Sequence, residues 1–172
     1  MSESLFPVDP PASQRLSQDA LNHILALHRL WLMSDEAEGE RAVLSGLNLY
    51  GRSLWRADLR RAQLDGCTLR GADLDHADLS EASLIAVCLV RASLWSARLH
   101  RAQLAYADLG GANLDHADLC GADLTEADLT GASLWGARLY GAEMLRINGL
   151  TAEQLATVCD GGGTRAPAAR AF

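Results

Sequence analysis

The chain has 172 residues, a net charge of −7 and four cysteines, and this composition excludes several classes of protein. It has no run of about 18 apolar residues, so no segment is expected to cross a membrane. Its acidic balance argues against direct binding to nucleic acid. A chain of this length is expected to form one domain. Its cysteines show no CxxC spacing, so we expect the protein in the reducing cytoplasm. These cysteines are Cys67, Cys88, Cys120 and Cys159.

Residues 1–16 predict an extended tail. They contain three prolines, which are Pro7, Pro10 and Pro11. The stretch from Met1 to Gln14 has no basic segment followed by an apolar one. We therefore do not expect it to act as a signal peptide.

A helix is expected to begin after Ser17, which is a suitable N-cap, and to end near Met33. Its apolar side chains recur at helical spacing along one face. They are Leu21, Ile24, Leu25, His28, Trp31 and Leu32. We expect residues 17–40 to form a capping helix followed by an acidic linker, with His28 as a packing residue.

Leucine recurs at every fifth residue from Leu44 to Leu139, and Met144 takes the next place. Alanine lies two residues before most of these leucines, as in Ala72-Asp73-Leu74. A period of five matches neither the helical period of about 3.6 nor the strand period of about 2. It describes a unit that turns a corner every five residues, which indicates a solenoid.

The spacing also predicts the shape of the coil. Alanine and leucine point to the same side of an extended segment, and the small or polar residues after leucine form a corner. Four corners close a square of about 20 residues, a period within the range of solenoid repeats. Ser53-Leu54-Trp55 returns at residues 93–95 and 133–135, and the segment 75–79 returns at 115–119. Both intervals are whole numbers of four-sided coils and not of three-sided ones, which favours a square over a triangle.

Residues 42–148 resemble the pentapeptide-repeat family, whose motif is A(D/N)LxG. The resemblance implies an all-β solenoid, namely a right-handed quadrilateral β-helix of about five coils. Leu47 and Arg52 replace the inward alanine at its start. An inward arginine is not expected to be buried without a partner. We therefore expect a covered first coil, in which Arg52 binds an acid of the capping segment or a backbone carbonyl.

The C-terminal segment predicts a second cap. Thr151 and Gln154 form a capping box that opens a short helix through Val158, and a loose tail follows. Caps are expected because a solenoid exposes leucines and strand edges at both ends. The alternative is that one helix docks a partner. The chain thus divides into residues 1–16, 17–40, 41–149 and 150–172.

We predict no catalytic, cofactor or metal site, and therefore no enzyme. His76 and His116 hold the same place two coils apart, hence about 10 Å. This distance is too long for one metal ion, which binds its ligands at about 2 Å. The neighbouring acids Asp75 and Asp115 lie on a smooth wall without a pocket.

The outer wall carries the candidate interaction surface. Stacking the coils aligns two neighbouring columns of side chains on this wall. Elsewhere on the wall, Arg61, Glu81 and Arg101 form a separate ladder of alternating charge. The surface comprises Trp55, Asp75, Trp95, Asp115 and Trp135, with Asp78, Arg98, Asp118 and Arg138 beside them. The charges, together with Asp58, either set the register of the coils or flank a binding stripe of tryptophans.

Two functions are consistent with these features. One is a non-enzymatic scaffold or adaptor that binds a protein partner, including a second copy of the chain as a homodimer. The other, implied by the resemblance, is a DNA mimic that binds DNA gyrase and protects or inhibits it. Duplex DNA presents roughly 14 charges over about 24 Å. Residues 41–149 hold 13 acids and 11 arginines, which favours the scaffold.

Overall fold

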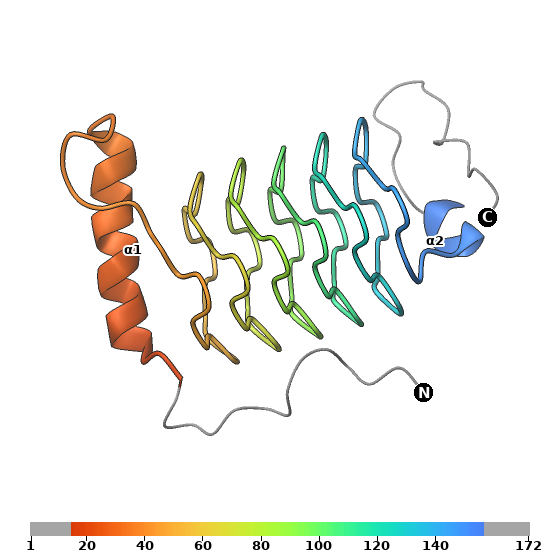
Figure 1. Cartoon of the computed structure of the whole chain (residues 1–172), viewed down its shortest axis with the longest axis horizontal. Helices are drawn as coiled ribbons and strands as arrows, with labels where there is room; N and C mark the ends of the chain where they lie inside the picture. Colours follow the sequence, from red (N-terminus) through yellow and green to blue (C-terminus); the bar gives the residue numbers. More distant parts are fainter. Residues whose placement is uncertain (1–14, 157–172) are drawn as a thin grey trace.

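The computed structural model describes residues 15–156. A rod of stacked coils lies between two helices (Figure 1). Helix α1 (Gln18–Met33) stands across one end of the rod, and helix α2 (Ala152–Ala156) lies at the other end. The predictions for the tail at residues 1–14, for the end of the second helix at Val158 and for the loose C-terminal tail lie outside the described residues.

Each coil consists of four pentapeptides and has four sides. One residue of each pentapeptide forms a parallel bridge with its equivalent four repeats later. These bridges run from Val43–Gln63 to Asp128–Asn148 and recur at every repeat. All bridges between the described residues are isolated, so no continuous strand forms, although several backbone hydrogen bonds join each side to the next coil, as in Leu44 to Gln63 (2.7 Å) and Gly46 to Asp65 (2.9 Å). The reason is the corner, where the N–H of each inward alanine donates to the carbonyl of the preceding leucine, as in Ala77 to Leu74 (3.0 Å).

The core is the column of leucines that the sequence predicts. Every repeat leucine from Leu44 to Leu134 is at most 2% exposed, and Leu139 is 8% exposed. The alanines two positions earlier fill the remaining space, since Ala62 and Ala82 are fully buried. The free energy of burial is roughly 2 kcal/mol for each leucine.

The Asp or Asn of the motif has a role in the corner. Its side chain accepts a hydrogen bond from the backbone N–H two residues later, as between Asp73 and Asp75 (3.1 Å) and between Asp123 and Thr125 (2.9 Å). This arrangement satisfies an N–H group that the turn leaves free. The carboxylates of the motif are therefore part of the fold.

The corners also place side chains in the left-handed region of backbone conformation. Gly66 (φ +62°) and Ala86 (φ 53°) occupy the same corner in successive coils. This region costs a residue with a Cβ roughly 1–2 kcal/mol. Glycine avoids that cost but loses more backbone entropy on folding, about 0.5–1 kcal/mol.

We expect Ala86→Gly to raise the free energy of unfolding by about 0.5–1 kcal/mol, and Gly66→Ala to lower it by a similar amount. A Cβ at Gly66 meets only open space, so the change would come from the backbone alone. Urea denaturation of both variants measures the effect. A more stable Gly66→Ala variant would show that the corner is unstrained.

Helix α1 covers the first coil as predicted. Its N-cap Ser17 accepts a hydrogen bond from the N–H of Ala20 (3.1 Å). Leu21 is fully buried in the leucine core, and Ile24 and Leu25 pack against it. The apolar face of α1 therefore replaces a preceding coil.

Polar groups before and within α1 satisfy the open edge of the first coil. The side-chain amide of Gln18 donates to the carbonyl of Ser53 (2.9 Å) and accepts from its N–H (3.1 Å). The N–H of Leu16 donates to the carbonyl of Asn48 (2.9 Å). Arg52 Nε donates to the carbonyl of Leu16 (2.6 Å), which confirms the expectation that Arg52 binds a backbone carbonyl near the end of the rod.

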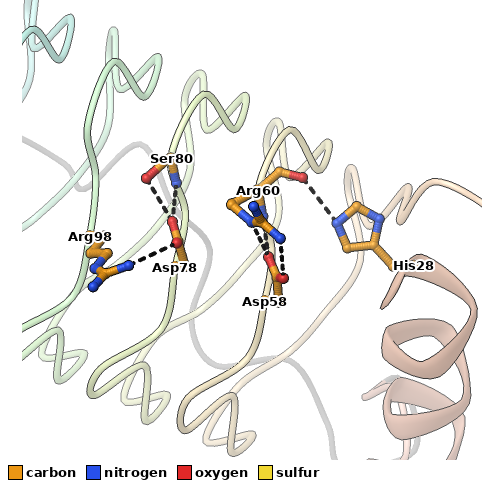
Figure 2. Close-up of polar contacts among 6 residues, drawn as sticks. All are labelled: His28, Asp58, Arg60, Asp78, Ser80 and Arg98. Carbon is orange, nitrogen blue, oxygen red and sulfur yellow. Dashed lines mark hydrogen bonds and ion pairs between the residues drawn. The ribbon is translucent and has the colours of Figure 1, made fainter. Parts of the chain in front are cut away.

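His28 joins α1 to the rod from a fully buried position. Its Nδ1 accepts from the N–H of Ala42 (3.1 Å), and its Nε2 lies 3.1 Å from the carbonyl oxygen of Arg60 (Figure 2). A carbonyl only accepts hydrogen bonds, so Nε2 carries the hydrogen and the ring is neutral. Burial lowers the pKa of His28 below its ordinary value of 6.5, although the hydrogen bond to the Arg60 carbonyl and the charge of Asp58 act in the opposite direction.

This lowered pKa predicts a loss of stability in acid. As the pH falls below about 6.5, the unfolded chain takes up a proton that the folded ring excludes, so the free energy of unfolding falls by at most about 1.4 kcal/mol per pH unit. The loss is complete below the folded pKa. Denaturation curves for the wild type and for His28→Gln, compared from pH 8 to pH 5, isolate this component. Equal slopes for the two proteins would contradict it.

The C-terminal cap begins with the predicted capping box. The N–H of Gln154 donates to Thr151 Oγ1 (3.1 Å), and the N–H of Thr151 donates to Gln154 Oε1 (2.7 Å). The Gln154 amide also donates to the carbonyl of Ala132 (2.6 Å), in the place that the next coil would occupy. Each end of the rod thus uses a glutamine side chain in place of missing backbone.

Candidate interaction surface

Three tryptophans lie in one column on the outside of the rod. Trp55, Trp95 and Trp135 are 53%, 40% and 60% exposed. The bridges from Ser53 to Asp73 and onward to Ser133 place these residues on the same side of successive coils. We call the column of Trp55, Asp75, Trp95, Asp115 and Trp135 the tryptophan wall.

The two acids of the tryptophan wall bind the next coil. Asp75 Oδ1 accepts from Ser93 Oγ (2.5 Å) and from the N–H of Trp95 (3.0 Å). Asp115 accepts in the same way from Ser133 Oγ (2.5 Å) and from the N–H of Trp135 (2.9 Å). These carboxylates therefore position the tryptophans, a role that the sequence does not reveal.

Two histidines lie against the wall, whereas the sequence suggested for them only metal binding or acid–base chemistry, neither of which we predicted. The His76 ring contacts Trp95 edge to face, with centroids 4.7 Å apart, and His116 contacts Trp135 at 4.6 Å. His116 also lies 6.3 Å from Trp95 on its other side. The signal was present in the sequence, because each Asp-His pair precedes its tryptophan by one coil. The four rings form a continuous aromatic ladder.

Trp55 has a different neighbour, because the first coil has no earlier Asp-His pair beneath it. The guanidinium of Arg56 lies over its indole, 4.4 Å from the ring centroid. A cation over an aromatic face contributes about 0.5–1 kcal/mol at an exposed site. Trp55 is therefore separate from the aromatic ladder.

A column of charged side chains runs beside the tryptophan wall and forms ion pairs between coils. This charged column comprises Asp58, Asp78, Arg98, Asp118 and Arg138. Arg98 lies 3.6 Å from Asp78 (Figure 2), and Arg138 lies 3.0 Å from Asp118. Burial of Asp118 opposes its ionisation, but hydrogen bonds from Cys120 and the charge of Arg138 hold its pKa below the ordinary value. Exposed pairs of this kind typically stabilise by less than about 1 kcal/mol.

Asp58 differs from the other members of the charged column. Its carboxylate binds Arg60 of its own coil, with 2.7 Å between Arg60 Nη2 and Asp58 Oδ2 (Figure 2). The expected ladder of Arg61, Glu81 and Arg101 is also altered. Arg61 pairs with Glu36 in the loop after α1 and lies over the ring of Trp31 (4.9 Å). Arg61 thus interacts with the N-terminal cap, whereas the sequence assigned it to a ladder on the outer wall.

The cysteines contribute no reactive group that the structure reveals. Cys67, Cys88 and Cys120 are buried free thiols, and Cys159 lies outside the described residues. Burial raises the pKa of Cys67 to about 12. Within residues 15–156, no group of three His, Cys, Asp or Glu side chains is arranged to hold a metal ion. No helix in this range is long and apolar enough to cross a membrane.

Comparison with known proteins agrees with this architecture. The family model for pentapeptide repeats matches residues 42–144 in overlapping segments. No curated protein sequence is significantly similar to the chain. Among solved structures, the pentapeptide repeat protein Rfr23 of the cyanobacterium Cyanothece is 30% identical, with a TM-score of 0.61, over 62% of this chain and 87% of that one.

Two further structures have lower TM-scores. HetL, a pentapeptide repeat protein involved in regulating heterocyst differentiation in the cyanobacterium Nostoc, is 30% identical over 63% of this chain and 66% of that one, with a TM-score of 0.40. QnrB1, a plasmid-mediated fluoroquinolone resistance protein, is 18% identical over 63% of this chain and 68% of that one, with a TM-score of 0.42. The matching repeats and the four-repeat coil together show that this chain belongs to the pentapeptide-repeat family.

Proposed function

We propose that this chain is a non-enzymatic scaffold that binds a partner protein through the tryptophan wall. The observation that supports this proposal is the exposure of Trp55, Trp95 and Trp135 in a single column. Tryptophan is enriched among the residues that dominate binding energy at protein interfaces, and aligned exposed apolar groups are typical of such sites.

The surroundings of the column support binding as well. Arg98 and Arg138 flank it with side chains that are 72% and 52% exposed, which provides a polar rim. The rings of His76 and His116 contact the indoles of Trp95 and Trp135, which restricts these side chains before any partner binds and so reduces the entropy lost on binding. A rigid aromatic column with an arginine rim suits a protein ligand.

Three finer features belong to the same proposal. The rod is taken to be right-handed, as the family resemblance implies. Helices α1 and α2 serve as caps and not as docking helices, because their polar groups replace missing backbone at the two ends. The proposed compartment is the cytoplasm, where free thiols are stable.

We expect replacement of Trp55, Trp95 and Trp135 by serine to weaken partner binding by several kcal/mol, since hot-spot residues contribute about 2 kcal/mol or more each. Thermal stability should change little, because all three indoles lie on the surface and are 40% exposed or more. Pull-down from host extract and a thermal melt measure the two effects. Tyr106→Ser is the matched control, since Tyr106 is 55% exposed in a different column.

A large loss of thermal stability with binding intact would show that the tryptophans serve the fold alone. Equal binding losses in Tyr106→Ser would show that the tryptophan wall is not the specific site. A supercoiling assay with purified gyrase tests the DNA-mimic alternative. That alternative is less well supported, because the motif carboxylates bind their own backbone and Arg98 and Arg138 interrupt the acidic column.

A further inference from the structure

We propose that the tryptophan wall binds a polyproline II segment of its partner protein, with a proline at every third residue. This inference rests on the proposed function, because it needs the tryptophan wall to bind a protein. It adds the chemistry and the conformation of the segment that is bound. Three successive prolines of that segment meet the indoles of Trp55, Trp95 and Trp135.

The first argument is the distance between the indoles along the rod. Parallel bridges connect Ser53, Ser93 and Ser133 through one intervening coil each, so each tryptophan lies two coils from the next. Two inter-strand spacings amount to about 9.6 Å, and four amount to about 19.2 Å. A polyproline II segment completes one turn in three residues and advances about 9.3 Å, so every third side chain returns to the same side. Over all three indoles the mismatch is only about 0.6 Å.

The other regular conformations fit this spacing less well. Side chains of a β-strand alternate between two sides, so those on one side recur at about 6.6 Å or about 13 Å. In an α-helix, residues seven apart recur at about 10.5 Å on nearly the same face. Across three indoles the helix is about 1.8 Å too long, and its contact face turns away by about 40°. The polyproline II repeat therefore stays in register with the wall where a strand or a helix does not.

The second argument concerns the indole N–H groups of the same three tryptophans. Within residues 15–156, none of these groups donates a hydrogen bond to another residue, although all three side chains are exposed. A polyproline II backbone has no internal hydrogen bonds, so its carbonyl groups are free to accept them. A helix uses its carbonyl groups internally, apart from those of its last turn. Indole donors on an aromatic surface therefore suit a proline-containing extended segment.

The third argument is the charge beside the indoles. Arg98 and Arg138 follow the second and third tryptophans by three residues. Their side chains are 72% and 52% exposed, whereas the aspartates that pair with them are 23% and 30% exposed. The guanidinium of Arg56 lies over the indole of Trp55, 4.4 Å from the ring centroid. An accessible positive charge thus accompanies each indole, so we expect an acidic residue of the partner next to each proline.

The acids within the wall do not reverse this charge preference. Asp75 accepts hydrogen bonds from Ser93 Oγ and the N–H of Trp95. Asp115 is held in the same way by the next coil. These donors offset part of the negative charge of each carboxylate. The partner segment is therefore expected to combine prolines with acids.

Two synthetic peptides of nine residues test the spacing directly. The in-register peptide has the repeat Pro-Ala-Asp three times. The matched control has the same composition, with prolines at its first, fifth and ninth positions, so that successive prolines lie about 12.4 Å apart and on different sides. NMR of the full-length protein follows the indole N–H signals of its four tryptophans, and single Trp→Phe variants assign them.

The in-register peptide should shift the signals of Trp55, Trp95 and Trp135 with a single Kd and leave that of Trp31 in place. The matched control should bind about tenfold more weakly or worse, because it engages one indole at a time. Trp95→Ser should weaken binding of the in-register peptide by a similar factor, whereas Tyr106→Ser should not change it.

Equal affinity for the two peptides would overturn the inference, and so would unchanged indole signals at millimolar in-register peptide. Tighter binding of a helical peptide with leucine at every seventh residue would also contradict it. The tryptophan-to-serine pull-down tests the proposed function separately. A partner that is lost in that pull-down but is not displaced by the in-register peptide would leave the proposed function standing and refute this inference. Displacement by the in-register peptide and not by the matched control would support both.

Discussion

Replacing Leu94 with aspartate is expected to prevent folding. Leu94 is fully buried, and Leu74 and Leu114 occupy the same place in the coils on either side. An isolated carboxylate there would have no partner, and burying it would cost more than the roughly 5–15 kcal/mol by which a domain is typically stable. Leu94→Ala is the milder change and should lower the free energy of unfolding by about 2–5 kcal/mol through the cavity it leaves.

Circular dichroism and a thermal melt measure both variants. The matched control is Gln103→Asp, because Gln103 is the exposed residue before Leu104, where other repeats carry aspartate. That variant should fold and melt like the wild type. A Leu94→Asp protein with a wild-type melt would show that this leucine does not point inward.

Deleting residues 1–40 is expected to cause aggregation. The deletion removes Leu21 from the core, and each repeat leucine that it uncovers loses about 2 kcal/mol of burial free energy. It also removes the partners of Asn48, Ser53 and Ala42, so a row of backbone groups becomes available to pair with another chain. Size-exclusion chromatography with light scattering measures the result.

The control for this experiment is deletion of residues 1–14, which leaves α1 and its contacts in place. It should fold and stay monomeric, because it keeps Leu21 in the core and the hydrogen bonds of Leu16 and Gln18 to the first coil. A soluble, monomeric and equally stable protein without residues 1–40 would mean that α1 is a docking helix and not a cap.

Most of the rod could be predicted from the period of the sequence. A leucine at every fifth residue can be buried only if the chain turns a corner in every repeat, so the core, the corners and the coil length follow from one pattern. The same logic predicted the partner of Arg52, because a buried guanidinium requires an acceptor and the end of the rod offers carbonyl groups. The N-cap Ser17 and the capping box at Thr151 were predictable because they depend on neighbouring residues only.

The details of the wall were not predictable in the same way. Periodicity places Asp75 between two tryptophans, but it does not show that the carboxylate turns toward Ser93 and the Trp95 N–H of the next coil. It also does not show that His76 turns its ring onto Trp95. Arg61 pairs with Glu36 instead of Glu81 because the loop after α1 brings a carboxylate to the first coil. These choices depend on side-chain torsions, which a repeat pattern does not specify.

The four-sided coil also restricts how this chain can change length in evolution. Inserting or deleting a single pentapeptide would rotate every later residue by a quarter turn, which would divide the three tryptophans between two faces. Loss of one whole coil keeps the faces aligned, but it can bring two tryptophans into successive coils where an Asp-His pair now lies between them. Only steps of two coils preserve both the faces and the alternation seen between Ser53-Leu54-Trp55 and its two copies. Viable length variants of this protein should therefore gain or lose coils in even numbers.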